Sequence, residues 1–86
     1  MDVMIPSQLQ AYTGGASRVT ASGETLGDVL ENLDEVYPGI RFRMLDEQDR
    51  IREHIRIFVS GEPATTVELV LDEHDEVQIV GALSGG

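Results

Sequence analysis

The apolar residues of this chain follow two different periods. Near the start and over the second half they alternate with polar residues, which is typical of strands with one buried face. Between these regions they recur every three or four positions, as on one face of a helix. The pattern therefore predicts a domain that mixes α and β structure.

The first 22 residues predict a β-hairpin. Three apolar residues share one parity, as a half-buried strand requires: Val3, Ile5 and Leu9. Pro6 interrupts them, which favours an edge or a bulge because proline has no N–H to donate to a neighbouring strand. The two glycines of residues 13–15 suit a turn, since glycine adopts positive φ readily, and residues 18–22 form the returning strand.

The clearest predicted element is a helix over residues 26–36. Its apolar residues form one stripe at helical spacing: Leu26, Val29, Leu30, Leu33, Val36 and Tyr37. Thr25 is the expected N-cap, with Asp28 three residues on as its partner in a capping box, and the Pro38-Gly39 pair ends the helix. We interpret the stripe as core that packs across a sheet.

Alternation returns after the helix. It predicts strands at residues 40–45, 55–59 and 77–80, and a less regular one at residues 67–71. Residues 46–53 are polar, residues 60–63 have turn composition, and residues 72–76 are a charged turn. The last strand runs directly into residues 81–86.

The chain closes on Gly85-Gly86. Two consecutive glycines make a thin arm that can enter a narrow active site, because neither carries a Cβ. The alternative interpretation is an ordinary frayed terminus. We expect a folded domain over residues 1–81 and a flexible tail over residues 82–86.

Length and composition limit the possible functions. The chain has 86 residues, which make one small domain, and no cysteine, which excludes disulfides, thiolate zinc sites and a catalytic thiol. The N-terminal region has no basic segment followed by an apolar run, and no stretch is long enough to cross a bilayer. These features predict a soluble, cytoplasmic protein.

Charge narrows the range of partners. Sixteen acidic residues against six basic ones give a formal net charge of -10, and every basic residue is arginine. Nucleic acid and anionic membranes are therefore poor partners, whereas a basic protein surface is a plausible one; the acidity is equally consistent with solubility alone. Because the chain has no lysine, none of its own side chains could form an isopeptide bond with the terminal carboxylate if that carboxylate were activated.

The chain offers no clear catalytic or metal site. Its two histidines, His54 and His74, lack metal-ligand spacing, and we expect both to be solvated. Residues 72–76 carry four carboxylates but no calcium-loop pattern. We expect no catalytic residue, no metal and no intrinsic cofactor.

Five segments in order carry a resemblance to a known family. They are Tyr-Thr-Gly-Gly at 12–15, Gly-Glu-Thr-Leu-Gly-Asp-Val-Leu at 23–30, Tyr-Pro-Gly-Ile at 37–40, Ile-Phe-Val-Ser-Gly-Glu at 57–62, and Asp-Glu-Val-Gln-Ile-Val at 75–80 running on to Gly86. The chain resembles the ubiquitin-like β-grasp sulfur carriers, the MoaD/ThiS family. This family includes the small subunit of molybdopterin synthase and the thiamine-biosynthesis carrier. The Tyr-Thr-Gly-Gly and Tyr-Pro-Gly motifs look most similar to the branch serving cysteine synthesis or tRNA thiolation.

The resemblance implies a fold and a chemistry. The fold is α+β, a β-grasp with a mixed sheet of four to five strands and one main helix across it. A ubiquitin-activating-type adenylyltransferase would use ATP to adenylate the Gly86 carboxylate. A sulfur donor, either a sulfurtransferase or a cysteine desulfurase, would then supply sulfur to form a thiocarboxylate. That group would pass sulfur to an accepting biosynthetic enzyme, so the protein is a co-substrate and not an enzyme.

The same resemblance implies roles for residues near the end of the chain. Gly85 and Ser84 would thread into the partner, and Leu83, Phe58 and Ile79 are candidate contacts with it. Strand alternation does not say which face Phe58 and Ile79 occupy. The alternative function is a ubiquitin-like protein modifier, or a binding module that acts through its folded surface.

Overall fold

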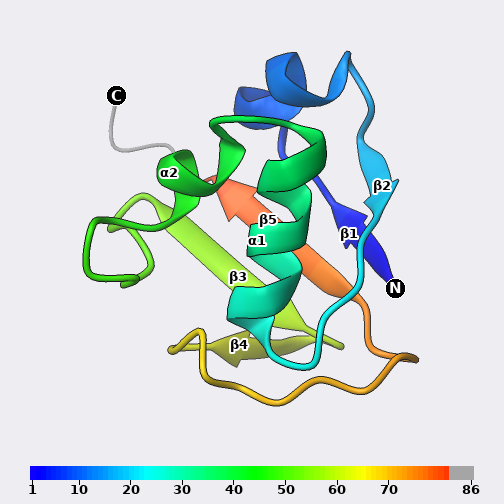
Figure 1. Ribbon diagram of the computed structural model, residues 1–86, viewed down its shortest axis with the longest axis vertical. Helices are drawn as coiled ribbons and strands as arrows, with labels where there is room; N and C mark the ends of the chain where they lie inside the picture. The colour runs from blue at the N-terminus through cyan, green and yellow to red at the C-terminus, as the bar shows by residue number, and fades with distance from the viewer. Residues whose placement is uncertain (82–86) are drawn as a thin grey trace.

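Five strands form one mixed sheet in the computed structural model, which describes residues 1–81. The strands are β1 (Asp2–Met4), β2 (Arg18–Thr20), β3 (Ile55–Val59), β4 (Glu62–Ala64) and β5 (Val77–Gly81), in the order β2-β1-β5-β3-β4. Only β1 and β5 pair in parallel, and the other neighbours are antiparallel. The main helix, α1 (Leu26–Val36), lies across one face (Figure 1). The expected α+β fold and mixed sheet are confirmed.

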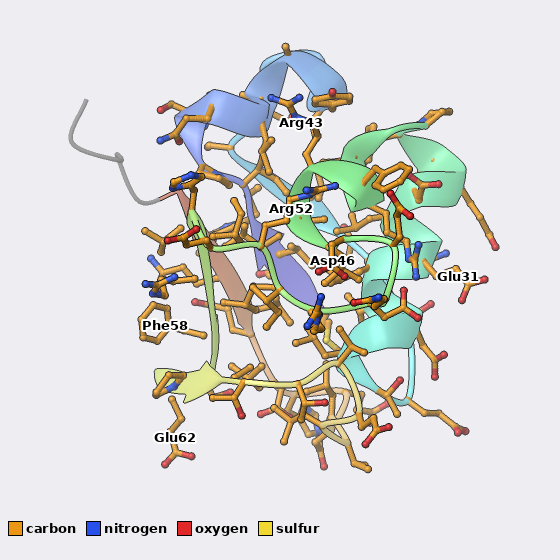
Figure 2. All side chains as sticks on the ribbon, turned by 90° about the vertical axis from the view of Figure 1, so that its left-hand side faces the viewer. Glu31, Arg43, Asp46, Arg52, Phe58 and Glu62 are labelled. Atoms are coloured by element: carbon orange, nitrogen blue, oxygen red, sulfur yellow. The ribbon has the colours of Figure 1, made fainter. Side chains whose placement is uncertain are left out.

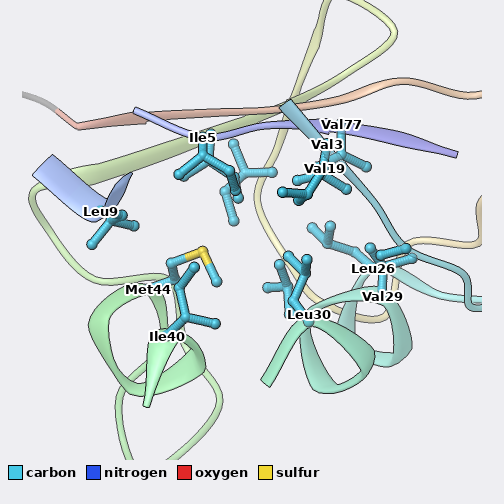
Figure 3. Close-up of a cluster of buried hydrophobic side chains, with 14 of the residues drawn as sticks. Val3, Ile5, Leu9, Val19, Leu26, Val29, Leu30, Ile40, Met44 and Val77 are labelled. Carbon is cyan, nitrogen blue, oxygen red and sulfur yellow. The ribbon is translucent and has the colours of Figure 1, made fainter. Parts of the chain in front are cut away.

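The core lies between the sheet and the helices. Alternate strand residues such as Val3, Ile57 and Val77 face the buried stripe of α1, as period two along a strand and 3.6 along a helix require. Figure 3 shows Val3 and Val77 on the sheet side facing the buried side chains of α1, with Ile40 and Met44 beside them. Eighteen apolar residues are buried there, which gives this small domain a single continuous core.

Helix α1 agrees with the sequence in its bounds and in its N-terminal cap. Thr25 Oγ1 accepts a hydrogen bond from the backbone N–H of Asp28 at 3.2 Å, and the Asp28 carboxylate accepts one from the N–H of Thr25 at 3.3 Å. These two bonds form the predicted capping box and satisfy N–H groups that the helix leaves unpaired.

The first strand is shorter than predicted. β1 ends at Met4, and a 3-10 helix, η1 (Ser7–Thr13), occupies the region where Leu9 was expected to continue the strand. Pro6 explains the change: it lacks an N–H for the sheet, and its carbonyl accepts from the N–H of Leu9 at 2.9 Å, which starts the helical turn. Leu9 is buried all the same, at 3% exposed. β1 and β2 do pair antiparallel, through a longer connection than a tight turn.

The predicted strand over residues 40–45 is wrong. The segment forms a short helix, α2 (Ile40–Met44). Ile40 and Met44 are buried, whereas Phe42 between them is 57% exposed, which is the result of a helical and not a strand period. Gly39 makes the sharp entry with a φ of 96°, and the Asp34 carboxylate accepts hydrogen bonds from the N–H groups of Gly39 and Arg41.

Residues 67–71 do not form the predicted strand. The N–H groups of Leu26 and Gly27 donate to the carbonyls of Leu69 and Val67, so the segment runs beside the start of α1 and joins it through a single β-bridge. The predicted turn at residues 60–63 is shorter than expected, because β4 already begins at Glu62. Its two central residues, Ser60 and Gly61, both have positive φ, as tight hairpins require.

Candidate functional site

The last described strand lies at the centre of the sheet. β5 pairs with β1 on one side and along its whole length with β3 on the other, where Gly81 is opposite Ile55. β1 pairs only with Val77 and Gln78, so residues 79–81 are held by their pairing with β3 and by the Gln8 side chain, whose amide donates to the Gly81 carbonyl. The body therefore fixes the position and direction from which residues 82–86 continue.

A pocket adjoins the end of β5. Its volume is about 400 Å³, and it is lined by residues from four separate parts of the chain, including Gln8, Phe42, Arg43, Arg52, His54 and Gly81. The Gln8 side-chain amide donates to the Gly81 carbonyl at 3.3 Å, which links η1 to the end of the strand. Figure 2 shows Arg43 and Arg52 on the same half of the molecule as the point where the grey trace begins.

The sequence placed most of its functional residues in the tail. Gly86, Gly85, Ser84 and Leu83 all lie outside the described residues. The predicted division into a domain of residues 1–81 and a tail of residues 82–86 thus stays a prediction.

The structure separates the two other candidate contacts. Phe58 lies on the face of the sheet away from α1, where it is half-buried between Gln78 of β5 and Pro63 of β4 (Figure 2). Ile79 points the opposite way and is 2% exposed in the core. Ile79 therefore does not present a contact surface, because its parity along β5 is that of the buried Val77.

Sequence reasoning missed several surface residues near the strand end. Met4 and Val80 are half-buried apolar residues on the same open face as Phe58, with the exposed Arg56 opposite Val80. Which residues share a face depends on strand register, and register follows from pairings that the sequence does not display. Phe42 was missed because α2 was predicted to be a strand.

Two carboxyl groups of residues 1–81 have a shifted pKa, and both lie in turns. The N–H of Asp72 and the hydroxyl of Ser60 hold the pKa of Asp75 below its usual value of 3.8. The N–H of Arg50 is the largest of several effects that lower the pKa of Asp46. Each carboxylate accepts hydrogen bonds that favour its charged form, so both are structural carboxylates of exposed loops.

Within residues 1–81 the structure offers little chemistry of its own. No group of three or more His, Asp or Glu side chains there could hold a metal ion. No helix in this range is long and apolar enough to cross a membrane. Every buried side-chain polar atom described has a hydrogen-bond partner, so none is left poised for a ligand.

The comparisons with known proteins decide the family. The ThiS family model matches residues 3–86 of the chain. The chain belongs to the ThiS family. The sulfur carrier protein CysO of Mycobacterium tuberculosis is 34% identical over 89 residues, which cover 98% of this chain and 96% of that protein. The resemblance expected from the sequence is confirmed, and the chain groups with carrier proteins and not with enzymes.

Solved structures agree with this assignment. The crystal structure of M. tuberculosis CysO has a TM-score of 0.89 at 32% identity, over 95% of this chain and 98% of that one. A chain of the Amycolatopsis orientalis BexX/CysO complex has a TM-score of 0.90 at 27% identity, over 99% and 98%. The small archaeal modifier protein 1 of Methanosarcina acetivorans reaches 0.81 at 26% identity, over 99% and 94%. The β-grasp fold is therefore shared by named sulfur carriers and a named modifier.

Proposed function

We propose that this protein is a sulfur carrier whose reactive group is the carboxylate of Gly86. The observation that carries the proposal is that the family match runs to residue 86, so it includes the closing glycines as well as the folded body. The pairing of β5 with β3 as far as Gly81 supports it, because this pairing gives the segment after Gly81 a fixed origin. The body then presents the terminus and a partner enzyme supplies the catalysis.

The chemistry follows from the weakness of a carboxylate as an electrophile. A ubiquitin-activating-type adenylyltransferase transfers AMP from ATP to the Gly86 carboxylate and releases pyrophosphate. Hydrosulfide then attacks the acyl carbon, expels AMP and leaves the thiocarboxylate. With a persulfide from a sulfurtransferase or cysteine desulfurase, an acyl disulfide forms first, and a thiol reductant cleaves it to the same product. The resulting sulfur is a tethered nucleophile.

The accepting enzyme determines the pathway. Cysteine synthesis, tRNA thiolation, and thiamine or molybdopterin synthesis can all start from the same thiocarboxylate. The likeness to CysO supports the first of these as the acceptor class to test before the others. We expect the protein to act in the cytoplasm, because the activation step consumes ATP.

A second function has a specific observation in its favour. The likeness to the archaeal modifier protein supports a role in which Gly86 is joined to lysines of other proteins. Both roles begin with adenylation of the same carboxylate, so they differ only in the nucleophile that attacks the activated terminus.

Intact-mass spectrometry tests these alternatives. The full chain is incubated with the activating enzyme of the same organism, ATP and sodium sulfide, and we expect one oxygen of the chain to be replaced by sulfur. A variant lacking Gly85 and Gly86 is the control and should keep its mass. Conjugates on lysines of added proteins would favour the modifier role. An unchanged mass of the wild type, with an enzyme shown to be active, would overturn the carrier proposal.

A further inference from the structure

Charge is distributed unevenly between the two ends of the sheet. At the end where β3 finishes and β5 starts, the turns are acidic: Glu62, Asp72, Glu73, Asp75 and Glu76. At the opposite end, where Ile55 pairs with Gly81, the surface carries three arginines, Arg43, Arg52 and Arg56, together with His54 and one carboxylate, Glu53. Figure 2 shows this separation, with Glu62 at the edge of the molecule farthest from Arg43. A chain with a net charge of -10 therefore has a cationic end.

The arginines at this end keep their charge available. Arg41 and Arg50 form ion pairs with Asp49 and Asp46. By contrast, no carboxylate of residues 1–81 lies within ion-pair distance of Arg43, Arg52 or Arg56, and all three are exposed. Exposed guanidinium groups whose charge no internal carboxylate neutralises attract carboxylates of another molecule.

Two interactions hold the pocket in shape. The Arg52 guanidinium lies over the Phe42 ring, 5.5 Å from its centroid, and Arg52 Nε donates to the Phe42 carbonyl at 2.7 Å. Arg52 is thus fixed against α2, the short helix that carries both Phe42 and Arg43. Holding a side chain in place before binding reduces the entropy lost on association, and arginine is one of the residue types enriched among those that contribute most to interfaces.

The pocket's position restricts what can cover it. Gly81 is one of its lining residues. The five residues that follow can span at most roughly 17 Å when fully extended. A protein that takes Gly86 into a buried site must therefore approach the surface around Gly81 closely. The pocket lies within that area of contact.

We propose that the pocket formed by Phe42, Arg43, Arg52 and His54 docks acidic side chains at the entrance of the partner enzyme that takes up the tail. This inference rests on the proposed function and corrects, for this one surface, the expectation of a basic partner drawn from net charge. An acidic entrance is repelled by most of the body and attracted only by the end that carries the tail. Electrostatics therefore orient the carrier before the tail enters.

Steady-state kinetics of ATP–pyrophosphate exchange with the activating enzyme of the same organism test the proposal. The charge-reversal variants are Arg43→Glu and the double variant Arg43→Glu/Arg52→Glu. We expect each to raise the KM for the carrier about tenfold or more, with kcat within about twofold, because reversed rim charges weaken encounter and not chemistry. The wild-type KM should rise with salt, whereas that of the double variant should fall, because salt then screens a repulsion and not an attraction.

Arg18→Glu is the matched control, since Arg18 is exposed on the edge strand β2, which β1 separates from β5, it does not line the pocket, and the substitution changes the charge equally. Its KM should stay within about twofold of wild type. Thermal melts establish that all variants fold. Equal KM values for the Arg43 and Arg18 variants would overturn the docking proposal alone. A rise with Phe42→Ala but not with Arg43→Glu would mean an apolar contact and would also overturn it. A wild type that is never activated would overturn the proposed function and this inference together.

Discussion

One carboxylate determines how the chain passes from one helix to the next. Asp34 lies in the last turns of α1, and its Oδ1 accepts from the N–H groups of Gly39 at 3.0 Å and Arg41 at 3.1 Å. These N–H groups have no partner within α2 itself, because the first turn of a helix leaves its donors unpaired. Asp34 therefore acts as a cap supplied from the preceding helix.

Replacing this cap should destabilise the fold. We expect Asp34→Ala to lower the free energy of unfolding by about 1–2 kcal/mol, the usual effect of removing a capping acceptor. Urea denaturation measures the change. The neighbouring Glu35→Ala is the control: Glu35 is exposed near the negative end of the α1 dipole, so its removal should be neutral or slightly stabilising. Equal losses for the two variants would contradict the capping role.

At the scale of elements, a carboxylate joins the loop before β5 to the turn after β3. Asp75 accepts a hydrogen bond from the Ser60 hydroxyl at 2.7 Å and another from the N–H of Asp72 at 2.7 Å. Ser60 also donates its N–H to the Glu76 carbonyl. These bonds tie together the acidic ends of the two longest strands, and those to Asp75 are strongest when its carboxyl group is ionised.

The hydrogen bonds that Asp75 accepts make the free energy of unfolding depend on pH. Because the folded-state pKa of Asp75 lies below 3.8, its contribution is fully present above that value and is lost as pH falls through the lowered pKa. We expect Asp75→Asn to be less stable than wild type at neutral pH, and the difference to shrink below about pH 4. Denaturation curves across this range measure it. Glu73→Gln, in the same exposed loop, should show no such convergence; if it does, the effect is general charge and not this link.

The elements divide clearly into those that the sequence predicts and those that it does not. α1 and β3 were predicted at their observed bounds, because each has a sustained period and a clear start or stop signal. α2 was not predicted. Ile40, Phe42 and Met44 alternate with polar residues as in a strand, but Ile40 and Met44 are also four positions apart, which fits one face of a helix equally well. The hydrogen bonds that Asp34 accepts from Gly39 and Arg41 favour the helix, and the helix or strand propensities of single residues do not reveal such a contact. Residues 67–71 were misassigned because they complete the start of α1 and not a sheet.

At the scale of the whole molecule, we expect added salt to stabilise the folded state. Repulsion among the surface carboxylates of a chain with charge -10 destabilises the folded state, so we expect Tm to rise between low salt and about 0.5 M NaCl. Calorimetry measures Tm, and a Glu31→Gln/Glu35→Gln variant with less negative charge should show a smaller rise. A Tm independent of salt in the wild type would contradict significant self-repulsion.

The site could be predicted only in part. Ordered motifs along the chain predict the family, which the family match confirms, and a role for Gly86, which stays a prediction. The cationic pocket could not be predicted, because it is assembled from η1, α2, the loop before β3 and the end of β5. Net charge even pointed the other way. Averages over a composition say nothing about which charges end up as neighbours in space.

The strand order has a consequence for how the sheet assembles. β5 separates the pair formed by β1 and β2 from the pair formed by β3 and β4, so the two halves of the sheet join only when β5 takes its place between them. A nascent or truncated chain lacking β5 has two hairpins that cannot join and a core left open to water. A partner that recognises the assembled body therefore binds only chains in which β5 has joined the two halves.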